Sequence, residues 1–193
     1  MSNSKSNNAG EKIILGIDPG TNILGYGIIK GSGKNSMQLV ILGVIELGKF
    51  GDHYLKLKAI YERVQMLVDQ YHPDEVAIEA PFFGKNVQSM LKLGRAQGVA
   101  MAAVLSRSIP IFEYAPRKIK QSITGSGSAS KEQVAIMLKT LLKEKDFAQE
   151  YFDATDGLAA AVCHFYQQSC VLGNAGKASS WEAFIKQNPD RVK

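Results

Sequence analysis

Short runs of apolar residues near the start of the chain predict β-strands. Residues 13–17 form a continuous apolar run that ends at Asp18, which is followed by a Pro-Gly turn. Two further runs, 23–30 and 37–47, are separated by only a few turn-forming residues. Connections this short join antiparallel neighbours, so we expect the chain to open with a three-stranded antiparallel meander.

The pattern then changes to helices that alternate with short strands. Apolar residues recur at helical spacing over 53–71, and the run at 75–79 predicts a fourth strand. The helix between them allows this strand to pair parallel to the first. Residues 85–107 predict a long helix rich in Gly and Ala, which can pack closely against the sheet or a partner. A fifth strand is predicted over 109–114.

The rest of the chain is predicted to be helical. A short basic helix includes 117–120, a capping box at Ser130 starts a second helix, and the last helix begins near Asp153. We expect one domain flanked by two tails, with the bounds 1–11 for the flexible N-terminal tail, 12–171 for the domain and 172–193 for the C-terminal tail.

Two glycines mark the second predicted strand. Gly25 and Gly27 are two residues apart, so they lie on the same face of that strand. Glycine in a strand interior weakens it and often marks a site where another backbone approaches closely. We therefore expect an element to pack tightly against this face.

Four carboxylates are predicted to meet at one end of the sheet. Asp18 and Glu79 each end an apolar strand, and open α/β sheets place their sites at the carboxyl ends of parallel strands. Asp153 and Asp156 are three residues apart, so they share one face of the last helix. A helix cap and a first-turn acid would explain this second pair structurally, and that alternative remains open.

Carboxylates gathered at one point repel one another unless a cation neutralises them. An all-oxygen donor set favours Mg²⁺ or Mn²⁺ over Zn²⁺. Two such ions about 3.5–4 Å apart can support an in-line attack on a phosphodiester. We therefore expect a two-metal site that takes Mg²⁺, with Mn²⁺ as a substitute, and its ligands are Asp18, Glu79, Asp153 and Asp156.

The positive charge of the chain is concentrated in one region. The net charge is +5, yet residues 85–145 hold eleven Lys or Arg against three Glu, a local net charge of +8. This distribution suggests a nucleic-acid partner, although a solvated basic face would explain the charge as well. No apolar run approaches the about 20 residues that span a bilayer, so we expect no membrane contact.

The cysteines and histidines suggest no catalytic chemistry. Cys163 and Cys170 are seven residues apart on one predicted helix, too far for a disulfide, which favours free thiols in a reducing cytoplasm. Neither they nor the three scattered histidines have the spacing of a zinc site.

Taken together in chain order, these segments resemble the RuvC family of Holliday junction resolvases over roughly residues 12–170. The matching motifs are Gly16-Ile17-Asp18-Pro19-Gly20-Thr21 with Gly25-Tyr26-Gly27, Ala77-Ile78-Glu79 with Phe82, Lys85 and Asn86, Leu91-Lys92-Leu93-Gly94, Phe112-Glu113-Tyr114, Lys120-Gln121, Lys131 with Gln133-Val134, and Asp153-Ala154-Thr155-Asp156. The resemblance implies an α/β fold of the ribonuclease-H-like type. Its five-stranded mixed sheet has strands 1–3 antiparallel, strands 4–5 parallel to strand 1, and helices on both faces.

The resemblance also implies roles for single residues. The four acids match the family's metal-binding catalytic residues, and Lys120 and Lys131 match basic residues near the scissile phosphate. Phe82 matches an aromatic residue that stacks on an exposed base at the junction centre. Within the basic region, Lys85, Arg117 and Lys118 are predicted as further DNA contacts.

The implied activity is that of an Mg²⁺-dependent endonuclease in homologous recombination and DNA repair. A homodimer of this family nicks two strands of like polarity symmetrically across a four-way DNA junction. The products carry 5′-phosphate and 3′-hydroxyl ends that a ligase can seal. The implied partner is the RuvA–RuvB branch-migration complex, and the implied location is the cytoplasm.

Three other functions fit part of the pattern. A non-catalytic junction-binding protein would need only the basic region, and ribonuclease H proper shares the acids. Kinases of the actin and sugar-kinase type also begin with a strand that ends in an acidic turn. Those chains normally hold two such domains, for which 193 residues are too few.

Overall fold

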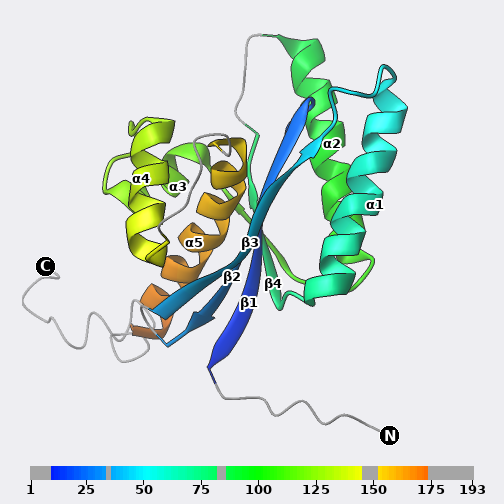
Figure 1. Ribbon diagram of the computed structural model, residues 1–193. Coiled ribbons are helices and arrows are strands. Elements are labelled where there is room, and N and C mark those ends of the chain that lie inside the picture. The colour runs from blue at the N-terminus through cyan, green and yellow to red at the C-terminus, as the bar shows by residue number, and fades with distance from the viewer. Residues whose placement is uncertain (1–9, 34–35, 82–85, 145–151, 174–193) are drawn as a thin grey trace, which may run out of the picture.

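The computed structural model describes residues 10–33, 36–81, 86–144 and 152–173. Figure 1 shows a twisted sheet with helices packed on both of its faces. The strands are β1 (Glu11–Asp18), β2 (Ile23–Ser32), β3 (Ser36–Glu46), β4 (Glu75–Glu79) and β5 (Ile111–Tyr114). The helices are α1 (His53–Tyr71), α2 (Val87–Leu105), α3 (Pro116–Thr124), α4 (Lys131–Leu142) and α5 (Phe152–Gly173).

The sheet is mixed, as the sequence predicts. Its strand order is β3-β2-β1-β4-β5. The first three strands are antiparallel neighbours, β4 is parallel to β1, and β5 is parallel to β4. The helix between β3 and β4 makes the parallel pairing possible, because a hairpin can join only antiparallel strands. The fold prediction is therefore confirmed.

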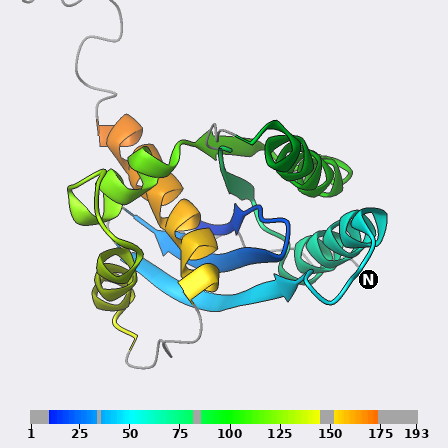
Figure 2. The same ribbon diagram turned by 90° about the horizontal axis from the view of Figure 1, so that it is seen from above.

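Two separate layers of helices cover the sheet. α1 and α2 lie on one face and α3, α4 and α5 on the other, which Figures 1 and 2 show from two directions. Alternate residues of β1 divide between the two cores: Leu15 and Ile17 pack in the core under α1 and α2, and Ile14 packs in the core under α5. Even-numbered residues of β1 therefore face α5.

Several element ends differ from the sequence prediction by one to two residues, and two of these differences have a clear physical cause. β5 begins at Ile111 and not at residue 109, because Pro110 has no N–H to give to the ladder; its carbonyl accepts from the N–H of Val76 at 3.0 Å. α2 begins at Val87 and not at residue 85, since the side chain of Asn86 caps it by accepting from the N–H of Ser89.

α5 packs directly on the backbone of β1 and β2. A Cβ atom added to Gly25 would lie 1.8 Å from the carbonyl oxygen of Asp153, and one added to Gly16 would lie 2.1 Å from that of Gly157. The predicted close approach to the face that carries Gly25 and Gly27 is confirmed, and α5 is the element that makes it. This contact fixes the first turn of α5 over the carboxyl end of β1.

Several predictions concern residues outside the described part. Residues 1–9, 174–193 and Phe82 and Lys85 lie there, so the tails, the domain bounds and these two contacts stay predictions. Cys163 is a buried free cysteine. Within the described residues, no helix has the length and apolar character to cross a membrane.

Candidate active site

Asp18 and Glu79 end neighbouring parallel strands. Ile17 of β1 is paired with Ile78 of β4, so the two acids that follow lie side by side at the same end of the sheet. Asp18 is on the even-numbered face of β1, and Glu79 shares the face of β4 on which Ala77 packs under α5. Both carboxylates are partly buried and point toward the helix layer of α5.

The first turn of α5 brings two more acids to this end. Asp153 lies in that first turn, inside the helix and not at its cap, because α5 already includes Phe152. The structural alternative in which Asp153 caps the helix is therefore wrong. The side chain of Asp156 is 16% exposed and that of Asp153 is 48% exposed, so the two differ in their access to water.

Lys131 joins the site from α4. Ser130 caps this helix in a capping box with Gln133, which fixes Lys131 as its first residue. The Lys131 Nζ atom lies 2.5 Å from Asp156 Oδ2 and 3.7 Å from Asp153 Oδ1. Figure 1 shows the start of α4 beside the start of α5, at the end of the molecule where β1 also ends. Four segments distant in sequence, β1, β4, α4 and α5, thus supply one cluster of charges.

Asp18, Glu79 and Asp156 hold their protons more tightly than free carboxyl groups do. Burial, followed by the negative charge of Asp156, raises the pKa of Asp18 to about 7. Burial, followed by the charge of Asp18, raises the pKa of Glu79 to about 8. Burial also raises the pKa of Asp156, although its hydrogen bond with Lys131 acts in the opposite direction. The site is short of positive charge at neutral pH.

Lys131 is held in its charged form. Burial alone would lower the pKa of its ammonium, but the hydrogen bond that it donates to Asp156 and the charges of Asp156 and Asp153 raise it. Among the described residues, Lys131 forms ion pairs with Asp156 and Asp153 but with neither Asp18 nor Glu79. The positive charge of Lys120 on α3 is close enough to oppose the rise in the pKa of Glu79 and of Asp156.

The residues fit divalent cations in chemistry and charge. The donors are all carboxylate oxygens, which suit Mg²⁺ and Mn²⁺, and the raised pKa values of Asp18 and Glu79 show that the site gains from added positive charge. Within the described residues, no three His, Cys, Asp or Glu side chains already converge as a ready metal cluster. Asp156 in particular is turned to Lys131.

A small cleft opens beside the acids. Its volume is about 150 Å³, and it is lined by Asp18, Pro19, Glu79, Ala80, Pro81, Leu93 and Gln97. Gln97 is 7% exposed, and its Nε2 donates to Glu113 Oε1 at 2.8 Å. Gln97 was not among the predicted site residues. It stands between the buried helix positions Ala96 and Ala100, where a polar side chain is the signal that could have revealed it.

The other predicted DNA contacts of α3 are spread over its surface. Arg117 and Lys118 are exposed, and Lys120 is half-buried. The Arg117 side chain packs against the loop that contains Gly127. The charge of Lys118 acts on Cys163, which places Lys118 toward the middle of α5 and not at the acids. Of these residues, Lys120 alone influences the carboxylates.

A buried histidine that the sequence analysis set aside has a full set of partners. His164 is 0% exposed; its Nδ1 lies 2.6 Å from the Tyr114 hydroxyl and its Nε2 lies 3.0 Å from Glu75 Oε2. Lys12 is paired with the other oxygen of Glu75 at 2.6 Å. This network ties α5 to β1, β4 and β5, so it holds the helix that carries Asp153 in a fixed position on the sheet.

Known proteins share both the sequence and the fold of this chain. The family model described as crossover junction endodeoxyribonuclease RuvC matches residues 14–164. A crossover junction endodeoxyribonuclease RuvC of Bacteroides fragilis is 62% identical over 187 residues, which are 95% of this chain and 97% of the relative. The protein of the same name from Cytophaga hutchinsonii is 57% identical over 196 residues, covering 100% of this chain and 94% of the relative.

A solved structure agrees with these relatives. The structure of T. thermophilus RuvC in complex with a Holliday junction substrate superposes with a TM-score of 0.76 at 28% identity, covering 83% of this chain and 96% of that one. The chain belongs to the RuvC family of crossover junction endodeoxyribonucleases.

Proposed function

We propose that this chain resolves four-way DNA junctions with two divalent cations held by its four clustered acids. Endonuclease activity on crossover junctions follows from its family. The observation that carries the metal-dependent part is the pair of raised pKa values of Asp18 and Glu79. Buried carboxylates that repel one another are stabilised by a cation. Enzymes that hold pairs of divalent cations use them to hydrolyse phosphodiesters.

The substrate in this proposal is a Holliday junction. A junction is the substrate bound by the T. thermophilus relative, which shares the fold over most of this chain. We propose that two strands of like polarity are nicked symmetrically. Each cut would leave a 5′-phosphate and a 3′-hydroxyl, the ends that a ligase can join. This activity belongs to homologous recombination and DNA repair.

The four acids have the following parts in the proposed mechanism. Asp18 lies between the strand that carries Glu79 and the helix that carries the other two acids. Asp18, Glu79, Asp153 and Asp156 would together hold the divalent cations. Bound Mg²⁺, or Mn²⁺ in its place, supplies an activated water and neutralises the departing 3′ oxygen.

The lysines complete the site. Lys131 pairs with Asp156, and we propose that its ammonium neutralises charge on the scissile phosphate. Lys120 neutralises the same phosphate from α3. Phe82, Lys85, Arg117 and Lys118 stay predicted DNA contacts, with Phe82 stacking on a base at the junction centre.

We also propose a homodimer, because two symmetric cuts need two active sites. The outer stripe of α2 supports this: Val87 is 68% exposed, Leu91 is 50% exposed and Leu105 is 58% exposed. These residues share one helix face with Gly94 and Gly98, whose added Cβ atoms would meet open space. Sedimentation velocity of Leu91→Glu should show a monomer; an unchanged dimer would exclude this face.

The branch-migration partner and the location rest on the family alone. We propose the RuvA–RuvB complex as the partner on the junction. We propose a cytoplasmic location, where bacterial recombination takes place. Neither proposal draws on a contact within the described residues.

The proposed function is tested by mapping nicks on a synthetic mobile four-way junction in Mg²⁺. We expect cuts at symmetric positions on two strands of like polarity, with ligatable ends. Asp18→Asn should abolish cutting and keep junction binding, which separates a nuclease from a non-catalytic junction-binding protein. An RNA–DNA hybrid serves as the control substrate. Cutting of the hybrid in preference to the junction would contradict the proposal.

A further inference from the structure

A second polar cavity opens at the same end of the molecule, on the other side of the sheet from α4. It has a volume of about 300 Å³. It lies among the turn between β1 and β2, the first turns of α1, and the first turns of α2, which Figure 1 shows close together where β1 ends. Its lining residues are Thr21, Asn22, Gly51, His53, Lys56, Ser89 and Lys92.

Among the described residues, the lining is rich in hydrogen-bond donors and contains no carboxylate. Lys56 Nζ donates to the Thr21 carbonyl at 3.1 Å and to Asn22 Oδ1 at 3.0 Å, which leaves one of its three N–H groups. Because Asn22 Oδ1 accepts from Lys56, the amide of Asn22 keeps its NH₂ donors for another partner. Such a cavity favours an anion.

Two further polar groups of the lining have no hydrogen-bond partner within the described residues. Lys92 has neither an ion pair nor a hydrogen bond with any residue of the described part. The Nε2 atom of His53 is buried and, within the same part of the chain, has no hydrogen-bond partner. Lys56 has a structural task, since it ties the β1–β2 turn to α1, but Lys92 has none. Buried polar atoms are rarely left unpaired.

The cavity is close to the acids along the chain. Thr21 follows Asp18 by three residues, so their Cα atoms are at most about 10 Å apart. A DNA strand carries one phosphate for about each 3.4 Å of helix axis. A strand that runs from Asp18 toward α2 would therefore bring a phosphate to this cavity about one to three nucleotides from the scissile one.

We propose that this cavity binds a backbone phosphate of the cleaved strand, and that Lys92 is its principal cation. The inference rests on the proposed function, because it needs a nucleic-acid strand at Asp18. Lys131 approaches the acids from the α4 side, and Lys92 lies on the α2 side. The strand is thus held on both sides of the cut, which fixes its register at the acids.

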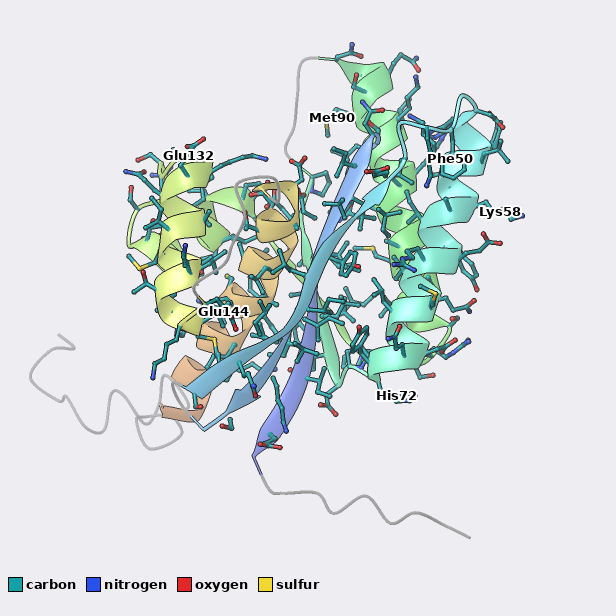
Figure 3. The ribbon with its side chains drawn as sticks, viewed as in Figure 1. Phe50, Lys58, His72, Met90, Glu132 and Glu144 are labelled. Carbon is teal, nitrogen blue, oxygen red and sulfur yellow. The ribbon has the colours of Figure 1, made fainter. Side chains whose placement is uncertain are left out.

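Lys92→Gln is the test variant, with Lys58→Gln as its control. Lys92 is exposed on α2, and Gln keeps the helix propensity, so folding should be unchanged. Lys58 is an exposed lysine of α1 outside the cavity, where Figure 3 shows it pointing into solvent, and its loss changes the net charge equally. Lys56 is left unchanged because it also fixes the turn.

The first measurement is junction affinity against salt concentration, in EDTA so that no cutting occurs. We expect Lys92→Gln to flatten the slope of log K against log salt by about one unit, and Lys58→Gln to leave it unchanged. Equal slopes for Lys92→Gln and the wild type would overturn the proposal. If the wild type neither binds nor cuts junctions, the proposed function has failed instead, so the two failures are distinct.

The second measurement identifies the phosphate. Single neutral methylphosphonate linkages are placed one to three nucleotides on either side of the cut. At one linkage, we expect wild-type affinity to fall about fivefold, with no further fall in Lys92→Gln. Additive losses at every linkage would show that Lys92 contacts none of these phosphates, and would overturn the assignment of the cavity to the cleaved strand.

Discussion

Lys131 lies against Asp156, with Nζ 2.5 Å from Oδ2, at the point where the first turns of α4 and α5 meet. This ammonium supplies positive charge that the neighbouring acids lack. It also competes with any cation for Asp156. The same contact that stabilises the free protein is therefore one that must change when the site is loaded.

Replacing Lys131 should impair cutting more than binding. Lys131→Gln removes the charge that we assign to the scissile phosphate, and loss of one such stabilising group typically costs about 100-fold or more in rate. Single-turnover cleavage at saturating junction measures this loss. Lys139→Gln, which changes another lysine of α4, is the control and should cut at the wild-type rate. A wild-type rate for Lys131→Gln would show that Lys131 takes no part in cutting.

Stability without metal should fall as pH rises. Asp18 and Glu79 have folded-state pKa values of about 7 and about 8, above their unfolded values, so the folded protein binds more protons between about pH 4 and 8. Each tenfold difference in proton affinity between the folded and unfolded states corresponds to about 1.4 kcal/mol. Both acids differ by more than this between the two states, so the free energy of unfolding should fall by roughly 3 kcal/mol or more as the pH rises. Urea unfolding in EDTA from pH 5 to 9 measures it.

The comparison for this pH profile is Asp18→Asn. Burial lowers the pKa of His164, so this histidine makes the free energy of unfolding rise as pH rises through the range in which it titrates. The Asp18→Asn variant keeps His164, so this contribution is the same in both proteins. The difference between the two profiles therefore isolates Asp18 and its effect on Glu79. Mg²⁺ should flatten the wild-type profile. Parallel profiles for wild type and variant in EDTA would contradict the account of Asp18.

Gly25→Ala should disturb the site through the backbone. Its added Cβ would lie 1.8 Å from the carbonyl oxygen of Asp153, so α5 must move away from β2. We expect a loss of about 3 kcal/mol or more in the free energy of unfolding, and a fall in cutting. Gly48→Ala is the control, since its Cβ would meet only the Asn22 carbonyl at 3.9 Å. Wild-type stability and cutting in Gly25→Ala would show that this packing does not position Asp153.

Tyr114→Phe should destabilise the protein without touching the acids. The variant removes the hydroxyl that lies 2.6 Å from His164 Nδ1, and a buried group left unpaired costs about 1–3 kcal/mol. Chemical unfolding at pH 8 measures the loss. Tyr71→Phe is the matched control, because within the described residues the Tyr71 hydroxyl forms no hydrogen bond. Equal losses in the free energy of unfolding for Tyr114→Phe and Tyr71→Phe would show that the His164 network does not hold α5 in position.

Sequence patterns predicted those features that depend on local order along the chain. The acids at the ends of β1 and β4 follow from apolar runs that stop at Asp18 and Glu79, and the close approach of α5 follows from alternating glycines. Partners across elements were not predictable. The pairing of Lys131 with Asp156 and of His164 with Glu75 depends on how α4, α5 and β4 are placed in space.

The central claim is that the clustered acids hold the divalent cations needed for cutting. Its most direct test counts Mn²⁺ bound per protomer by electron paramagnetic resonance, with a four-way junction present. The account predicts two ions for the wild type, a loss of at least one in Asp18→Asn, and no cutting by that variant. Equal Mn²⁺ binding by both proteins, or cutting of the junction in EDTA, would contradict it.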